Sequence, residues 1–315
     1  MLTKLRSLLA VAVLILPGAA GAQDFPNREV RLVVPFAPGG TVDVMGRYVA
    51  EKLSAEWQQP VVVENRPGAG SMIGAASVSH ARPDGHALLI VSGSYTTSAA
   101  IQKGLPFDPA TDLKPVGLVG VGHYLLIAGS RHPIGSMAEL AALAKEQKVF
   151  YGTTGVGSIS HLSGQLLNDI LGTQMEAVHY EGGSPAMVDL GGGRLDLFIG
   201  SPSEAGTGLG KPIATFSNMR LASLPDVPTV AEAGFPDAEV AAWWGILAPA
   251  GTPDDIVVKI NADIARVMGS PEGAAFLAAA GAVPPQMDAQ QFADHVNGEL
   301  ERWTALAEKH GIQSN

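Results

Sequence analysis

The sequence predicts an α/β protein built from two units of comparable size, and three observations lead to this prediction. From Arg31 onward, a short apolar run rich in β-branched residues is followed by a turn rich in Gly, Pro and Ser and then by a helix-like segment, and this order repeats. The runs are apolar almost throughout, which is typical of parallel strands covered by helices on both faces. The pattern also restarts after Asp112, which indicates a second unit.

The first unit contains three repeats of strand, turn and helix. Strands are expected at 31–36, 61–64 and 87–91, and helices begin near Asp43, Met72 and Thr97. A long apolar stretch at 116–128 leads into the second unit, with helices at 137–145, 160–171 and 185–190 and strands at 149–153, 177–180 and 195–199. A strand at 241–249 and helices at 253–268, 272–280 and 289–309 end the chain, and we expect these helices to pack on the first unit.

The composition excludes several classes of function. The 315 residues are 46% hydrophobic, so the chain has the material for a large core. The formal charge of −10, with no basic run, argues against a nucleic-acid partner. The absence of Cys excludes disulfides, thiolate catalysis and Cys-ligated zinc. The eight histidines form no pair with metal-ligand spacing, so we expect no metal site and no cofactor.

The first 22 residues have the features of a cleaved secretory signal peptide. Lys4 and Arg6 precede an apolar run at 8–16, and Ala20-Gly21-Ala22 precedes Gln23. The apolar run has about half of the ~20 residues that a membrane-spanning helix needs. Because residues 1–22 contain two basic and no acidic residues, cleavage takes the net charge from −10 to −12. We therefore expect a soluble, acidic protein of the periplasm.

The turn at 37–43, Ala-Pro-Gly-Gly-Thr-Val-Asp, lies between a predicted strand and a predicted helix. Two adjacent glycines let a ligand approach the backbone N–H groups, and a helix N-terminus favours an anion. The alternative is an ordinary tight turn in which Thr41 or Asp43 caps the helix. The residues alone leave both interpretations open.

The turn at 152–161 holds the densest cluster of glycines and small hydroxyl residues. It supplies several donors at one helix N-terminus, so ligand contact is expected. Local capping is one alternative, and an exported serine hydrolase with Ser158 as nucleophile and His161 as its base is another. The G-x-S-x-G elbow of many such hydrolases is absent because position 160 is Ser.

Two further patterns have simpler explanations. The glycine-rich turn at 67–74 nearly matches a dinucleotide fingerprint, but its third glycine is displaced by one position and no acidic residue follows at the required distance, so we assign it to helix–sheet packing. Trp243 and Trp244 resemble a stacking surface, yet in a returning strand they are expected in the core or hinge.

Five motifs resemble, in order and over nearly the whole mature chain, the substrate-binding receptors of tripartite tricarboxylate transporters, the Bug or TctC family. They are RLVVPFAPGGTVD, VVVENRPGAGSMIGA, ARPDGHALLI, YGTTGVGSISHLSG, and LPDVPTVAEAGFPD followed by WWGILAPAGTP. The resemblance implies a two-lobed periplasmic binding protein of type II architecture, each lobe a sheet flanked by helices. Such a receptor closes on a small carboxylate and delivers it to an integral membrane permease. Since no catalytic set stands out, we expect a binding protein and not an enzyme.

The apolar runs that join the two units place lobe 1 at 23–121 and 246–315 and lobe 2 at 122–245, with two hinge crossings between them. The resemblance places ligand-facing loops at 36–41, 92–96 and 153–161. The candidate ligand-binding residues are Phe36, Ala37, Pro38, Gly39, Gly40, Thr41, Ser92, Ser94, Thr154, Gly155, Ser158, His161, Tyr180 and Ser201. Because these three loops contain no Lys or Arg, we expect neutral donors to hold the carboxylate, chiefly the N–H groups of Gly39 and Gly40 and the donors at 154–158.

Two departures from the family pattern leave the ligand open. Relatives commonly have PYKG where this chain has Tyr180-Glu181-Gly182 after His179, and an Asp where it has Gly200-Ser201. Di- and tricarboxylates, acidic amino acids and aromatic carboxylates all remain candidates. We expect a monomer that docks on a permease, and a sensor kinase in the membrane is the alternative partner.

We predict that export removes residues 1–22 and that the mature protein begins at Gln23. The small residues at 20 and 22 fit the cleavage pattern of the signal peptidase. Intact-mass measurement of protein from the periplasm checks the site. Recovery of the uncleaved chain in the membrane fraction would contradict it.

Overall fold

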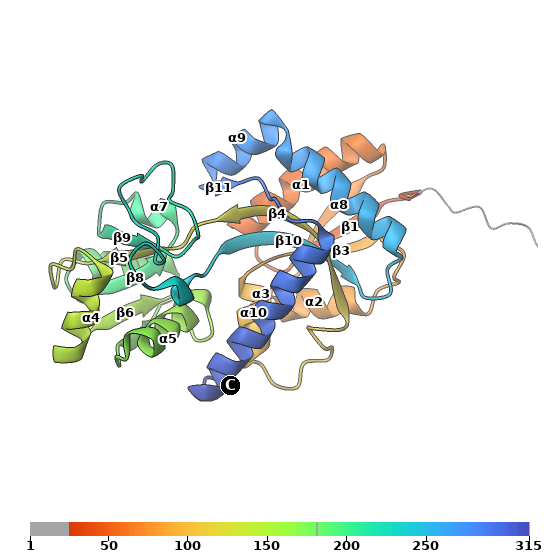
Figure 1. Cartoon of the computed structure of the whole chain (residues 1–315). Coiled ribbons are helices and arrows are strands. Elements are labelled where there is room, and N and C mark those ends of the chain that lie inside the picture. Colours follow the sequence, from red (N-terminus) through yellow and green to blue (C-terminus); the bar gives the residue numbers. More distant parts are fainter. Residues whose placement is uncertain (1–24, 181, 315) are drawn as a thin grey trace, which may run out of the picture.

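The structure, a computed structural model, describes residues 25–180 and 182–314, so the predicted signal peptide lies outside the described residues. The described chain forms two α/β lobes, each a sheet flanked by helices (Figure 1). This arrangement confirms the predicted fold class. Within the described residues, none of the helices has both the length and the apolar character that crossing a membrane requires.

Lobe 1 contains a six-stranded sheet in the order β11-β4-β10-β3-β1-β2. Strand β1 pairs in parallel with its two neighbours, whereas β10 is antiparallel to both β3 and β4. The strands are β1 (Val30–Val34), β2 (Val61–Asn65), β3 (Ala87–Ser92), β4 (Leu113–Gly122), β10 (Ala242–Pro249) and β11 (Ala282–Val283). The helices are α1 (Thr41–Trp57), α2 (Met72–Ser79), α3 (Ser94–Ile101), α8 (Asp254–Gly269) and α9 (Pro271–Ala279).

Lobe 2 contains a five-stranded sheet in the order β7-β6-β8-β5-β9. Strand β6 is parallel to β7 and β8, and β5 is antiparallel to β8 and β9. The strands are β5 (Leu125–Ala128), β6 (Phe150–Thr153), β7 (Glu176–His179), β8 (Leu197–Gly200) and β9 (Lys211–Thr215). The helices are α4 (Met137–Glu146), α5 (Ile159–Leu171), α6 (Gly183–Gly191) and α7 (Pro202–Ala205).

The chain passes between the two sheets at two places. The apolar stretch at 116–128 divides into β4 and β5, and only His123 and Tyr124 separate them. The return runs from the end of β9 to β10, which pairs with β4 from Ala242 opposite Gly122 to Pro249 opposite Leu113. The chain therefore leaves and re-enters lobe 1 on neighbouring strands. The residues about which the lobes hinge remain a prediction.

The last helix, α10 (Ala289–Lys309), packs on both lobes. The prediction that it packs on lobe 1 alone is therefore wrong. Phe292 and Val296 are buried in a core of lobe 1, while Trp303 and Leu306 are buried in the core of lobe 2. With 21 residues the helix is about 31 Å long. It therefore reaches beyond the lobe on which it begins.

Replacing Trp303 with Ala should lower the free energy of unfolding by about 3–5 kcal/mol, because a fully buried indole leaves a cavity. Urea unfolding followed by circular dichroism measures the change. The exposed Glu301→Ala on the same helix is the control and should change stability by less than about 0.5 kcal/mol. Equal stability of the two variants would show that this end of α10 does not support lobe 2.

Candidate functional site

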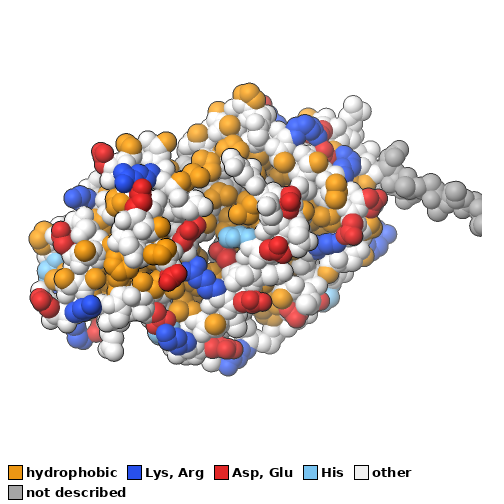
Figure 2. All heavy atoms as spheres, viewed as in Figure 1, with side chains coloured by type: hydrophobic (Ala, Val, Ile, Leu, Met, Phe, Trp, Pro, Cys, Tyr) orange, Lys and Arg blue, Asp and Glu red, His pale blue; other side chains and the backbone are white. Residues whose placement is uncertain are grey.

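A cavity of about 420 Å³ lies between the two lobes. Thr41 of α1 and Trp244 of β10 line it from lobe 1, Ser201 lines it from lobe 2, and His123 and Tyr124 line it from the crossing. Figure 2 shows that the surface is hollowed where the lobes meet. No Lys, Arg, Asp or Glu is among the described residues that line the cavity. Its size suits a small organic ligand.

A second hollow, of about 490 Å³, lies on lobe 1 between Phe25, Arg28 and Lys259. Its cations already have partners, since Arg28 pairs with Asp84 at 2.8 Å and Lys259 with Asp263 at 2.8 Å. All of its lining residues belong to lobe 1, so closure of the lobes would not act on a ligand there. The cavity between the lobes is therefore the better candidate site.

In the turn between β1 and α1, a carboxylate of the protein itself accepts one of the N–H groups that could bind an anion. The N–H of Gly39 donates to the carboxylate of Asp43 at 2.9 Å, and Arg47 and Asn65 donate to the same carboxylate. Burial would raise the pKa of Asp43, but these hydrogen bonds outweigh burial and lower it to about 2. The Gly39 N–H that we expected to face the ligand is therefore occupied. Gly40, and not Thr41 or Asp43, is the N-cap residue of α1.

The turn between β6 and α5 uses its hydroxyl groups mainly to cap the helix. Ser158 is the N-cap residue: its Oγ accepts from the N–H of His161 at 3.3 Å and donates to the carbonyl of Gly155 at 2.7 Å. The N–H of Thr154 donates to Oγ of Ser160 at 3.0 Å. The other first-turn N–H groups have no partner inside the helix. They are the donors that α5 has left for an anion.

The serine–histidine pair that the hydrolase alternative requires does not form between Ser158 and His161. Nδ1 of His161 accepts from the N–H of Gly157 at 3.1 Å, and the described contacts of Ser158 Oγ do not include the His161 ring. Burial, with a smaller contribution from the neighbouring ring of His179, lowers the pKa of His161 to about 4. This geometry holds the imidazole neutral and fixed by the backbone.

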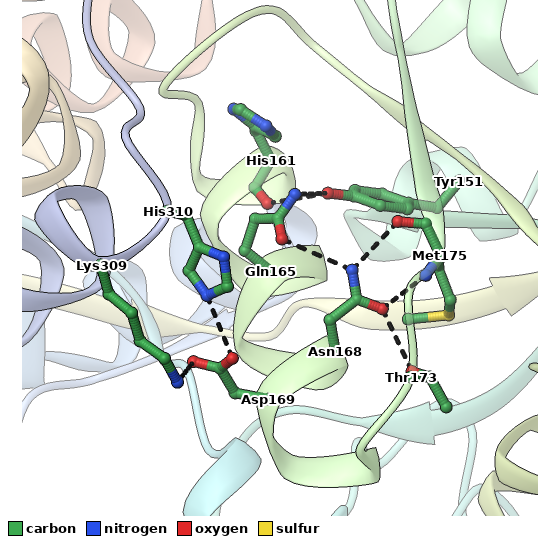
Figure 3. A network of polar contacts seen from close by, with 9 residues as sticks. All are labelled: Tyr151, His161, Gln165, Asn168, Asp169, Thr173, Met175, Lys309 and His310. Carbon is green, nitrogen blue, oxygen red and sulfur yellow. Dashed lines mark hydrogen bonds and ion pairs between the residues drawn. The ribbon is translucent and has the colours of Figure 1, made fainter. Parts of the chain in front are cut away.

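Helix α5 is fixed to the sheet of lobe 2 by a polar network (Figure 3). The hydroxyl of Tyr151 on β6 accepts from Gln165 at 3.2 Å and donates to the carbonyl of His161 at 3.4 Å. Asn168 bonds both the N–H and the carbonyl of Met175, at 2.7 and 3.0 Å. These contacts fix the orientation of the helix and hence the position of its N-terminus.

The same helix is tied to α10. Asp169 pairs with Lys309 at 2.8 Å and with His310 at 3.0 Å (Figure 3). Burial alone would raise the pKa of Asp169, but the two hydrogen bonds lower it below its usual value. The loop before α5 also contacts lobe 1. A β-carbon on Gly157 in this loop would overlap the side chain of Ile101 on α3.

The structure brings only some of the candidate residues together. Thr41 and Ser201 line the same cavity from opposite lobes. Both donors of Ser201 bond the carboxylate of Glu204, the Ser201 N–H at 2.6 Å and the Ser201 Oγ at 3.0 Å. Ser92 and Ser94 bond each other at 2.9 Å, and the hydroxyl of Tyr180 donates to Asp189 at 2.9 Å. Ligand contact by the candidate residues remains a prediction.

Apart from Thr41 and Ser201, the residues that line the cavity were not among the candidates, and His123, Tyr124 and Trp244 have the largest side chains among them. His123 is buried, and its Nδ1 lies 2.6 Å from the hydroxyl of Ser217. The sequence contains a feature that could have identified His123 and Tyr124, because this pair interrupts the otherwise apolar stretch at 116–128. Trp243 is buried in the core, as expected, whereas its neighbour Trp244 faces the cavity.

Two α/β lobes joined by two crossings, with a cavity between them, define the class of two-lobed periplasmic binding proteins. The chain belongs to the tripartite tricarboxylate transporter receptor family (TctC), whose model matches residues 45–312. It is 37% identical to a UPF0065 protein of Agrobacterium vitis over 281 residues, which is 87% of this chain and 81% of the relative. It is 31% identical to Protein BugT of Bordetella pertussis over 300 residues, 93% of this chain and 92% of the relative.

Solved structures agree with this assignment. The Rpa4515 protein of R. palustris with adipate has a TM-score of 0.77 and 35% identity, covering 92% of this chain and 99% of that chain. MatC from Rhodopseudomonas palustris with bound malate has a TM-score of 0.73 and 33% identity, covering 90% of this chain and 99% of that chain. The family predicted from the five motifs is thereby confirmed.

Replacing His161 with Gln should make the protein more resistant to mild acid. Because the folded state lowers the pKa of His161 to about 4, the unfolded chain takes up a proton below pH 6.5 that the folded protein does not. Between pH 7 and 5 the wild type should lose about 2 kcal/mol of unfolding free energy relative to the variant. Urea unfolding at both pH values measures this difference, and parallel pH dependence of the two proteins would contradict it.

Proposed function

We propose that this protein is a periplasmic solute-binding receptor that captures a small carboxylate by closure of its two lobes and delivers it to a tripartite tricarboxylate-type permease. The observation that carries the proposal is the cavity lined by Thr41 and Ser201 from opposite lobes. A ligand that contacts both lobes favours the arrangement in which they are close together. The adipate and malate bound to two relatives support a carboxylate as the ligand.

The carboxylate would be held by neutral donors. The cavity lining described above carries no basic side chain, whereas the N-termini of α1 and α5 carry unpaired N–H groups and the positive ends of helix dipoles. Micromolar affinity needs about 8 kcal/mol. Four or five hydrogen bonds to a charged group, at about 1.5–3 kcal/mol each, are sufficient to reach it and to offset the cost of association. A site without a buried cation also releases its ligand more readily to a permease.

The same proposal covers location and partners. The N-terminal 22 residues support export to the periplasm, where the mature chain would act as a monomer and dock on the permease. The role is binding and not catalysis, because the one candidate nucleophile, Ser158, caps a helix and its neighbouring imidazole is committed to a backbone N–H. In-cell crosslinking to a permease subunit, compared with a sensor kinase, tests the choice of partner.

Gly40→Pro and Ser158→Ala should each weaken adipate or malate binding at least tenfold in calorimetry. Gly40 has φ −78°, which proline adopts, so this change removes one N–H at α1 with little strain. Ser158→Ala removes the cap of α5 and should also cost about 1 kcal/mol of stability.

Small-angle scattering tests closure of the two lobes. The wild type should show a smaller radius of gyration with ligand than without it.

The matched control is Ser136→Ala. Ser136 caps α4 of lobe 2 in the same way, by accepting from the N–H of Glu139, and neither it nor any other residue of α4 is among the candidate ligand-binding residues or the cavity lining. This variant should lose similar stability and keep wild-type affinity. Unchanged affinity in the Gly40 and Ser158 variants, with all three folded, would place the carboxylate elsewhere.

A further inference from the structure

Helix α10 connects the cores of the two lobes. Its first half buries Phe292, Val296 and Leu300 in lobe 1, and its second half buries Trp303 and Leu306 in lobe 2. In Figure 1 it runs from the six-stranded sheet toward α5. A group at the middle of this helix therefore lies where the lobes meet.

Glu299 is such a group, and its side chain is only 7% exposed. Its Oε2 atom lies 2.9 Å from Oγ1 of Thr96 on α3 and 2.9 Å from Nε1 of Trp243 on β10. Trp243 also lies against the start of α3, since a β-carbon on Gly93 would be 3.4 Å from its Nε1. Glu299 thus joins α3, β10 and α10.

The hydrogen-bond geometry favours a protonated Glu299. Oγ1 of Thr96 lies 2.8 Å from the carbonyl oxygen of Gly93 as well as 2.9 Å from the Glu299 carboxyl, yet a hydroxyl has one proton to donate. If Glu299 is ionised, Thr96 faces two acceptors and satisfies only one. If Glu299 is protonated, it donates to Thr96, Thr96 donates to Gly93, and Trp243 donates to the carboxyl. The protonated carboxyl, the Thr96 hydroxyl, the Gly93 carbonyl and the Trp243 N–H then each have a partner.

The surrounding charges do little to favour the ionised form. Thr96 and Trp243 carry no charge, and Nε2 of His295 lies 3.8 Å from Oε1 while burial lowers the pKa of this histidine. Burial raises the pKa of Glu299 to about 7, against the opposing hydrogen bonds from Trp243 and Thr96. Two further ionisable groups interact with Glu299 directly, Tyr124 at the crossing and Arg302 on α10. Three carboxyl groups interact with these neighbours, Glu204 with Tyr124, and Asp237 and Glu239 with Arg302.

Arg302 is the nearest cation, and it is already engaged. It donates to the carbonyl oxygens of Glu239 at 2.7 Å and of Asp237 at 2.8 Å. Tyr124 stays neutral, because burial and the two nearby carboxyl groups raise its pKa. The proton on Glu299 is therefore the charge change that we expect in this part of the molecule near neutral pH.

We propose that protonated Glu299 positions the first turn of α3 for ligand binding, so that ionisation of Glu299 weakens the affinity for the carboxylate. The proposal rests on the proposed function of the cleft. Gly93 lies between Ser92 and Ser94, two candidate ligand-binding residues whose hydroxyl groups are 2.9 Å apart. An ionised Glu299 competes with the Gly93 carbonyl for the one proton of Thr96 and loosens this turn. Glu299 is a positioning residue, because it is buried behind the turn.

The test measures adipate and malate affinity by calorimetry at pH 6.5 and 8.5, where both diacids remain fully ionised. The wild type should bind at least fivefold more weakly at pH 8.5. Glu299→Gln, which cannot ionise, should change less than twofold over this range. Glu301→Gln removes the same charge from an exposed position of the same helix and should follow the wild type.

Amide hydrogen exchange of residues 93–98 without ligand provides a second readout. After correction for intrinsic exchange rates, protection should fall between pH 6.5 and 8.5 in the wild type and in Glu301→Gln but not in Glu299→Gln. Should the glutamine variant fail to fold, Thr96→Val removes the shared hydroxyl and should abolish the pH dependence in the same way. Identical pH dependence in all variants overturns the inference. If neither diacid binds the wild type, the proposed function fails, and the exchange data still decide the role of Glu299.

Discussion

The arrangement of the molecule depends on the pairing of β4 with β10. These strands lie side by side within the six-stranded sheet, and their pairing extends to Gly122, the last residue of β4 before the chain crosses to lobe 2, and to Ala242, the first residue of β10 after the return. Because this pairing holds the two strands together, we expect relative motion of the lobes to occur beyond it, at His123 and Tyr124 and in the segment that follows β9. His123 and Tyr124 also line the cavity, so a ligand bound there would lie where we expect this motion to begin.

The parts of the fold that the sequence predicted are those that depend on local patterns. The apolar runs and the glycine-rich turns identified the parallel strands and the helices that follow them, because burial on both faces and left-handed backbone leave a direct signature in composition. The division of the stretch at 116–128 into two strands was less visible, since both halves are equally apolar. The two-sided packing of α10 was missed for a related reason: periodicity shows that Phe292 and Trp303 are buried but not against which core.

The site was predicted less completely than the fold, and the reason is electrostatic. Glycine-rich helix N-termini attract anions, but here the protein supplies two anions itself. Asp43 accepts a hydrogen bond from the N–H of Gly39 at α1, and Glu204 accepts one from the N–H of Ser201 at α7. The Glu204 carboxylate also lies so close to Gly183, at the start of α6, that a β-carbon there would overlap it. A ligand has only the donors that remain. Sequence spacing finds a site of this kind but does not reveal which of its donors the chain has already used.

The two-sided packing of α10 has a consequence for folding. The strands of lobe 2 are continuous in sequence, yet its core is completed by Trp303 and Leu306, which follow the last strands of lobe 1 along the chain. Lobe 1 likewise waits for Phe292 and Val296. Neither core is whole without α10, so we expect both cores to be completed only when this helix docks.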